Sequence, residues 1–196
     1  MVEPPRLHIS GASGCGVSTL GAALARRLGA AHLDTDTFYW LPSEPPFQAS
    51  RAIPERLAML EAAFAAAAGG WVLSGSLDGW GDPLIPRFER VIFLSAPTEV
   101  RLARLRVRER ARHGADIDEG GASHAHHLDF LAYAEAYETG RFTGAMTGRH
   151  RARHEAWLAS LPCPVLRLDG EEPTERLADE VIASHQRLLT VERRQP

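Results

Sequence analysis

The chain has 196 residues, of which 44% are hydrophobic, and its formal net charge at pH 7 is −3. The length and apolar content predict one domain with a sizeable core, and the slight negative charge argues against general nucleic-acid binding. The longest apolar run, residues 62–68, is too short to cross a bilayer. Two cysteines, Cys15 and Cys163, provide no disulfide framework. We therefore expect a cytoplasmic protein that binds neither membranes nor nucleic acids.

Short apolar runs alternate along the chain with segments of helical periodicity. We expect strands at residues 7–9, 31–34, 71–74, 91–94 and 164–168, and helices at 20–28, 53–68, 98–112, 123–139, 149–160 and 174–189. Residues 38–47 are rich in aromatics and proline, which predicts neither regular helix nor central strand. The alternation predicts an α/β fold, with a parallel sheet covered by helices on both faces. Ligands of such sheets bind beyond the carboxyl ends of the strands.

A glycine-rich turn joins the first predicted strand to the first predicted helix. Its residues are Gly11, Ala12, Ser13, Gly14, Cys15, Gly16, Val17, Ser18 and Thr19, called the phosphate loop below. Glycine permits the backbone to turn its N–H groups inward, and the helix N-terminus adds partial positive charge. Ser18 stands where a hydroxyl binds a phosphate-bound magnesium ion. The turn therefore predicts a nucleotide phosphate site with Ser18 as the Mg²⁺ ligand.

Position 17 departs from the Gly-x-x-x-x-Gly-Lys-Ser/Thr pattern, because valine replaces the lysine. All 22 basic residues of the chain are arginine, so no lysine elsewhere can substitute for it. Backbone amides, helix start and serine remain, whereas the point charge on the β/γ-phosphates is lost. Two alternatives stay open: a phosphate-binding loop with weakened or no catalysis, and a glycine turn that binds no ligand.

These residues resemble the small P-loop kinases, which include adenylate kinase, shikimate kinase, gluconate kinase and bacterial relatives of undefined function. The resemblance covers most of the chain and rests on residues 11–19, 33–36, 72–76, 91–94 and 104–108. It implies a strand order of 2-3-1-4-5, ATP and Mg²⁺, a small-molecule acceptor, and a mobile helical lid. We place this lid at residues 114–148 of a single domain spanning residues 1–196. The departure at Val17 puts catalytic competence in doubt, and the acceptor does not carry over.

Acidic and small residues follow the second and third predicted strands. Asp34 and Asp36 are the candidate acceptor-binding acids; Asp36 is the candidate catalytic base, and Asp34 also belongs to the outer shell of the metal. If the strand continued through them, their side chains would point to opposite sides. Gly75, Ser76 and Trp80 are the other candidates for binding the acceptor. The alternative interpretations are acids that cap a loop and an ordinary turn whose aromatics pack at the rim.

Arginines occur on both sides of the predicted lid. Arg101, Arg104, Arg108 and Arg112 share one helical stripe, and Arg141, Arg149, Arg151 and Arg153 come later. Such a stripe is usually solvent-exposed. A site without lysine must still neutralise phosphoryl oxygens, however, and guanidinium groups do so with paired hydrogen bonds. We therefore take Arg104, Arg108, Arg149 and Arg151 as candidate catalytic residues.

The function that the sequence favours is transfer of the γ-phosphoryl group of ATP to a small acceptor, either a nucleotide or a hydroxyl-bearing metabolite. The alternative is a catalytically weak or inactive nucleotide-binding regulatory or sensor protein, for which Val17 is the main evidence. A GTPase is disfavoured, because the guanine-reading Asn-Lys-x-Asp motif is absent. We expect a monomer or homodimer.

Overall fold

The computed structural model describes residues 4–43, 47–142 and 148–192. Parts of the predicted aromatic stretch and of the predicted lid, at residues 44–46 and 143–147, lie outside the described residues. The strands are β1 (Arg6–Gly11), β2 (Ala31–Asp34), β3 (Trp71–Ser74), β4 (Arg90–Ser95) and β5 (Val165–Asp169). The α-helices are α1 (Val17–Leu28), α2 (Thr35–Tyr39), α3 (Ile53–Ala66), α4 (Thr98–His113), α5 (His124–Glu135), α6 (Arg151–Ser160) and α7 (Thr174–Glu192), and the 3₁₀ helices are η1 (Asp82–Arg87) and η2 (Gly114–Ile117).

All five strands form one parallel sheet in the order β2-β3-β1-β4-β5, which confirms the predicted fold class and strand order. Ile9 pairs with Ser74, Gly11 with Leu94, and Asp34 with Ser74, so the carboxyl ends of the strands meet at one edge. This edge carries the phosphate loop. The pairing therefore places the predicted nucleotide and acceptor residues together, as the alternation of elements implied.

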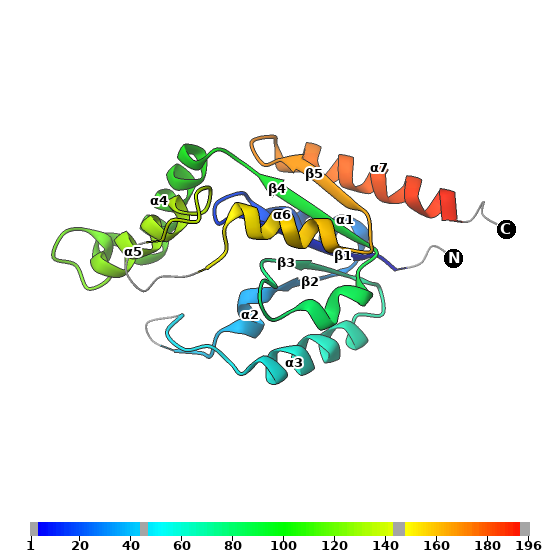
Figure 1. Ribbon diagram of the computed structural model, residues 1–196, viewed down its shortest axis with the longest axis horizontal. Helices are drawn as coiled ribbons and strands as arrows, with labels where there is room; N and C mark the ends of the chain where they lie inside the picture. Colours follow the sequence, from blue (N-terminus) through cyan, green and yellow to red (C-terminus); the bar gives the residue numbers. More distant parts are fainter. Residues whose placement is uncertain (1–3, 44–46, 143–147, 193–196) are drawn as a thin grey trace.

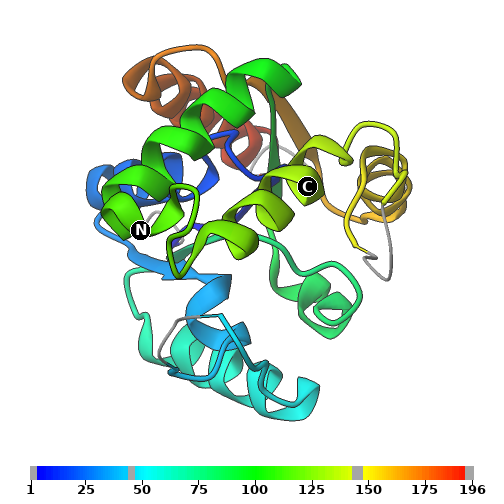
Figure 2. The ribbon, with the colours of Figure 1, turned by 90° about the vertical axis from the view of Figure 1, so that its left-hand side faces the viewer.

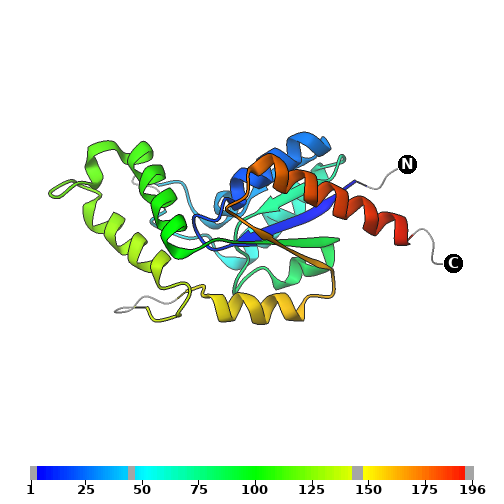
Figure 3. The same ribbon diagram turned by 90° about the horizontal axis from the view of Figure 1, so that it is seen from above.

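Each face of the sheet is buried by helices, because successive side chains of the central strands point to opposite faces. Leu7 and Ile9 of β1 pack with α1 and α7, whereas Val91 and Phe93 of β4 pack with α3, η1 and α6. Seen from above, α1 and α7 lie on one side of the sheet and α6 on the other (Figure 3). The β4 strand is therefore apolar on both faces, as is typical of parallel sheets, whereas β1 buries the polar side chains of His8 and Ser10 on its second face.

The segment between β4 and α6 forms an arm that projects from one end of the molecule, away from both termini (Figure 1). It consists of α4, η2 and α5, with Leu102, Leu105 and Ala134 buried between the two helices. Viewed end-on, the arm lies in front of the carboxyl edge of the sheet (Figure 2). The arm is therefore placed to reach ligands bound at that edge.

Several predicted boundaries were wrong, each for a local reason. Phe38 and Tyr39, which were expected to lie outside regular helix, belong to the short helix α2. This helix begins directly after β2, because the Asp34 carboxylate accepts a hydrogen bond from the Asp36 amide and so caps the N-terminus of α2. Trp40 then pairs with Ser50 in an isolated antiparallel bridge. The helix predicted at residues 123–139 is shorter, ending at Glu135, and the next one begins at Arg151 rather than at residue 149. Among the described residues, no helix is both long and apolar enough to cross a membrane.

Candidate functional site

The phosphate loop wraps the start of α1 with its backbone. Gly14 and Gly16 adopt φ angles of 87° and 93°, a region that side chains disfavour. Gly11 packs so closely on β4 that a Cβ atom would lie 2.5 Å from the Leu94 carbonyl oxygen. Gly16 precedes α1, and no described side chain caps the helix. The first N–H groups of α1 are therefore available to an anion.

Val17 points its side chain into the protein core rather than toward the phosphate-binding side of the loop, where a lysine would act. Its side chain is 9% exposed and belongs to the apolar core beneath the loop, together with Leu7, Ile9 and Leu20. Its methyl group would lie 3.1 Å from a Cβ atom at Gly11. The valine is therefore a packing residue, and any charge that acts on the phosphates comes from elsewhere.

Ser18 and Asp34 lie against each other at the carboxyl edge of the sheet. The Ser18 hydroxyl donates a 2.7 Å hydrogen bond to Asp34 Oδ2, and the Asp36 amide donates to Asp34 Oδ1. The side chains of Asp34 and Asp36 were expected to point to opposite sides only if the strand continued through both residues, and β2 ends at Asp34. Asp34 is instead the N-cap of α2, and Asp36 donates its amide to that cap. This pair of oxygen-bearing groups beside the phosphate loop suits a hard divalent cation.

Asp36 lies on the first turn of α2 with an accessible side chain. The protein around it still desolvates the carboxyl group, and this desolvation, followed by the charge of Asp34, raises the pKa of Asp36. Arg149, Arg108 and Arg112 oppose that rise in pKa. The shift brings the carboxylate closer to the basicity that proton transfer requires, and it places these arginines within electrostatic reach of Asp36.

Two of the four candidate catalytic arginines touch the phosphate loop directly. Arg104 donates to the carbonyl oxygens of Gly14, at 3.5 Å, and Gly170, at 2.8 Å. Arg149 donates to the Ser13 hydroxyl at 3.4 Å. Among the described residues, neither guanidinium has a carboxylate within ion-pair distance, so both retain charge that an anionic ligand can use.

The other two candidates are already paired with carboxylates. Arg108 forms an ion pair with the buried Glu109 at 3.0 Å, and Arg151 forms one with Glu138 at 3.3 Å. Arg108 nevertheless acts electrostatically on Asp36. The four candidate arginines thus fall into two that contact the phosphate loop and two that form ion pairs with glutamates.

Arg101 is fully buried at the base of the arm, although it shares the predicted helical stripe with Arg104 and Arg108. Its guanidinium donates to the carbonyl oxygens of Ser13, Ala96 and Ala134 and to the Thr98 hydroxyl. No sequence signal distinguishes it from Arg104, since burial follows only from how α5 packs against α4.

The candidate acceptor residues lie where β3 ends. Gly75 adopts a φ of 117°, and the Ser76 amide donates a 3.0 Å hydrogen bond to the Thr35 hydroxyl, which joins this turn to α2. The Ser76 hydroxyl accepts from the Asp78 amide at 3.2 Å. Trp80 is 6% exposed and packs in the core with Tyr39 at its edge. The structure therefore brings Gly75 and Ser76 to the edge of the site and buries the ring of Trp80.

Arg56 is a candidate residue that the sequence analysis missed. It is 6% exposed, its guanidinium carbon lies 3.8 Å from the centre of the Tyr39 ring, and its Nε donates to the Arg51 carbonyl. Among the described residues no carboxylate pairs with it. Tyr39 and Asp36 are three residues apart on α2 and so share a face. A buried cation without a counter-ion is costly, which makes Arg56 a candidate for contact with an anionic ligand.

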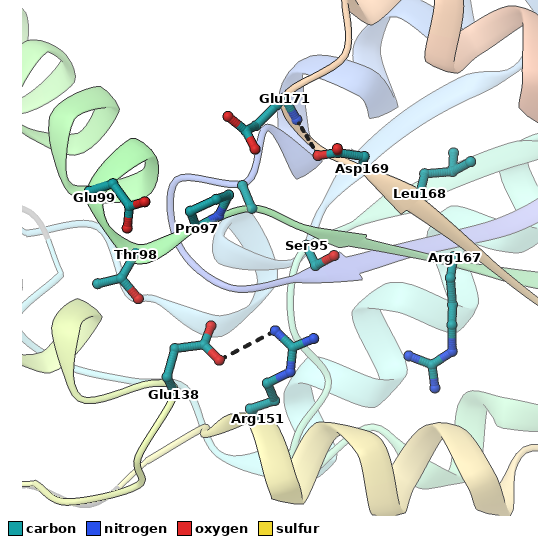
Figure 4. A pocket seen from close by; sticks show the side chains of 11 residues that line it. Ser95, Pro97, Thr98, Glu99, Glu138, Arg151, Arg167, Leu168, Asp169 and Glu171 are labelled. Carbon is teal, nitrogen blue, oxygen red and sulfur yellow. Dashed lines mark hydrogen bonds and ion pairs between the residues drawn. The ribbon is translucent and has the colours of Figure 1, made fainter.

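A pocket of about 660 Å³ lies beside the phosphate loop rather than within it (Figure 4). Its walls come from the ends of β4 and β5, the start of α4, and the Glu138–Arg151 pair. Neither the phosphate loop nor the Asp34–Asp36 cap lines it. This pocket is therefore separate from the residues that the sequence analysis predicted to bind nucleotide and acceptor. The described residues hold no group of three or more His, Cys, Asp or Glu side chains that could bind a metal ion by themselves.

The sheet order and the loop between β1 and α1 define the fold of the P-loop small-molecule kinases. Solved structures with this fold include a gluconokinase from Sinorhizobium meliloti 1021, which is 17% identical with a TM-score of 0.50 and covers 98% of both chains. A shikimate kinase from Bacteroides thetaiotaomicron is 16% identical with a TM-score of 0.51, covering 93% of this chain and 98% of that one. No family model matches the sequence. The uncharacterized protein YqaC of Bacillus subtilis strain 168 is 43% identical over 176 residues, which are 90% of this chain and 94% of YqaC, and the chain belongs to the YqaC family.

Proposed function

We propose that this protein is an ATP-dependent phosphotransferase that moves the γ-phosphoryl group of ATP to a small hydroxyl-bearing acceptor. The observation that carries the proposal is the Ser18–Asp34 hydrogen bond beside an uncapped helix N-terminus. A phosphate-binding backbone alone fits many ligands. A hydroxyl and a carboxylate held together beside it fit the magnesium ion that accompanies ATP.

In this proposal the loop amides and the N-terminus of α1 bind the β- and γ-phosphates. When bound, Mg²⁺ would neutralise phosphate charge, with Ser18 as its protein ligand and Asp34 in the outer shell. Asp36 accepts the proton of the acceptor hydroxyl, whose oxygen forms the bond to the γ-phosphorus while the bond to the ADP oxygen breaks. Arg104 and Arg149 supply the charge that Val17 cannot.

The region at residues 114–148 is the proposed lid of the single domain. Gly114 and Gly140, with φ angles of 58° and 65°, lie on either side of α5 and offer places where the backbone can turn. Closing the lid would exclude water from the γ-phosphate, while Arg149, just after the lid, already contacts the phosphate loop through the Ser13 hydroxyl. The arm that carries α5 lies in front of the carboxyl edge, which supports this assignment (Figure 2).

The test measures nucleotide binding and phosphoryl transfer separately. Calorimetry with ATP, ADP and GTP, each with Mg²⁺ and with chelator, establishes whether and how the loop binds nucleotide. Transfer from γ-labelled ATP is then followed with sugar acids, shikimate and nucleoside monophosphates as acceptors. We expect Mg²⁺-dependent binding of ATP and transfer to at least one acceptor. Failure of all three nucleotides to bind at millimolar concentration would end the proposal.

A second candidate function is a nucleotide-binding regulatory protein that transfers no phosphate. Val17 favours it, because the residue is packed into the core and leaves the loop without its usual charge. Tight nucleotide binding together with no transfer to any acceptor tested would support this function over the first.

A further inference from the structure

Arg101 joins three separate segments from a position without solvent access. Its Nη1 donates to the Ser13 carbonyl oxygen at 3.3 Å and to the Ala134 carbonyl oxygen at 3.0 Å. Its Nε donates to the Ala96 carbonyl oxygen at 3.3 Å. One guanidinium group therefore holds together the phosphate loop, the β4–α4 connection and the end of α5.

The backbone of Arg101 also supports the phosphate loop. A Cβ atom at Gly14 would lie 2.7 Å from the Arg101 carbonyl oxygen and 3.0 Å from its Cα. The outer turn of the loop thus rests on the first turns of α4, and the Arg101 side chain binds the residue next to that contact. This double contact fixes the position of Ser13.

A further set of contacts leads from Arg101 to the segment that carries Arg149. Glu138 lies 3.7 Å from the Arg101 guanidinium and 3.3 Å from that of Arg151. The ring of Tyr137 lies 5.2 Å from the Arg101 guanidinium carbon. The backbone carbonyl oxygen of Tyr137 accepts a 2.8 Å hydrogen bond from the Arg151 amide. Arg149, two residues before Arg151, donates a hydrogen bond to the Ser13 hydroxyl, so this set of contacts ends at the same residue that Arg101 binds.

We propose that Arg101 is a positioning residue, which fixes the phosphate loop and the segment around Arg149 relative to each other. Arg101 binds the carbonyl of Ser13 from inside the protein, while Arg149 binds the hydroxyl of the same residue. Loss of Arg101 would release both partners of the Ser13–Arg149 contact together. We call this set of Arg101 contacts the joint. The effect of the joint on catalysis rests on the proposed function, whereas its existence does not.

The joint is tested by hydrogen–deuterium exchange on the ligand-free full chain. The reporters are the amides of Cys15, Ala136 and Arg151, each of which donates a backbone hydrogen bond at one end of the joint. We expect Arg101→Met to speed exchange about tenfold or more at these amides while the strands keep their protection. The matched control is Arg90→Met, because Arg90 is also buried but lies at the first residue of β4, at the opposite end of that strand from the joint, where it binds Ser184 of α7. Unchanged exchange at Cys15 and Arg151, or an equal increase throughout the sheet, would overturn the proposal.

Glu138→Gln provides a second variant in case Arg101→Met fails to fold, because the Glu138 side chain is one-third exposed. It keeps the shape but removes the charge shared by Arg101 and Arg151. We expect faster exchange at the Arg151 amide with unchanged exchange in the strands. No change at Arg151 would count against the joint.

The catalytic consequence is tested by a double-mutant cycle in kcat. If Arg101 acts through Arg149, Arg101→Met should lower kcat in the wild-type background but change it less than about twofold in the Arg149→Ala background. Independent, multiplicative losses would overturn the positioning role. A protein with no phosphoryl transfer at all would contradict the proposed function, whereas the exchange experiment would still decide whether the joint exists.

Discussion

Ser18 donates a 2.7 Å hydrogen bond to Asp34, which connects the first turn of α1 to the end of β2 across the edge of the sheet. We expect Ser18→Ala to weaken binding of Mg²⁺-ATP while leaving binding of ATP in chelator nearly unchanged, because the hydroxyl serves the metal rather than the phosphates. Calorimetry under both conditions measures the difference. Ser160→Ala, which removes a hydroxyl at the end of α6, is the control. Equal weakening under both conditions would remove Ser18 from the metal site.

Val17→Lys should not restore a conventional loop. The valine is buried, so a lysine there must either bury its charge or displace the core, at a cost of about 1–3 kcal/mol in the free energy of unfolding. We expect a lower Tm and no gain in turnover. Val17→Ala separates loss of packing from the effect of charge. A large increase in turnover with lysine would show that the loop is merely weakened and not rebuilt around arginine.

Asp36→Asn should abolish transfer and preserve nucleotide binding, since the carboxylate is the proposed base. Because the pKa of Asp36 is raised, turnover of the wild type should increase as pH rises through that pKa. A nucleotide titration and a pH–rate profile measure these effects. Unchanged transfer by Asp36→Asn would exclude the residue from the mechanism.

The same substitution has a predicted effect on stability, with a definite sign. A carboxyl group whose pKa is higher in the folded than in the unfolded state binds more protons when folded, so it lowers stability as pH rises between the two pKa values. Asp36→Asn should therefore raise Tm slightly at pH 7, and the gain should disappear below the unfolded pKa of about 3.9. The gain is small because solvent screens an accessible carboxylate. Thermal denaturation across pH checks it, and a lower Tm at pH 7 would contradict it.

Arg104 and Arg149 should matter more for turnover than for affinity. Each touches the phosphate loop without a described carboxylate partner, and an arginine acting on transition-state charge contributes about a thousandfold or more in rate. We expect Arg104→Ala and Arg149→Ala to lower kcat at least about tenfold, or about 1.4 kcal/mol. Arg108→Ala and Arg151→Ala, which lose glutamate pairs, should have smaller effects.

Arg176→Ala is the control for these arginine variants, because it removes an exposed arginine of α7 that pairs with Glu172, just before the helix begins. It should leave kcat unchanged. If Arg104→Ala and Arg149→Ala also stay within about twofold of wild type, roughly 0.4 kcal/mol, the two arginines do not serve catalysis.

Arg56→Met should discriminate between acceptors. The buried guanidinium has no described carboxylate partner, so its loss should cost little stability but should raise KM for acceptors that carry a carboxylate or phosphate. Matched pairs, a hydroxy acid with its amide and a nucleotide with its nucleoside, measure this selectivity. Arg51→Ala, which removes the neighbouring Glu55 ion pair, is the control. Equal losses for charged and neutral acceptors would show that Arg56 only packs against Tyr39.

The sequence by itself determined the sheet and the phosphate loop, because both depend on local signals. Apolar runs such as residues 91–94 specify buried strands, and the spacing of Gly11, Gly14, Gly16 and Ser18 specifies a turn that a helix follows. These local patterns predicted the fold class, whereas the strand order was implied by the family resemblance, and the structure confirms both. They also identified Val17 as the departure from the motif.

Only the tertiary structure decided which charged groups meet. Arg101, Arg104 and Arg108 look equivalent in sequence, yet one is buried beneath the loop, one touches it, and one pairs with Glu109. Their separation depends on contacts with residues tens of positions away, such as Ser13 and Ala134, and no local periodicity encodes these contacts. Burial of Arg56 beside Tyr39 arises in the same way. Helical spacing fixes the direction of a side chain, whereas the packing of distant segments fixes its partner and so its charge environment.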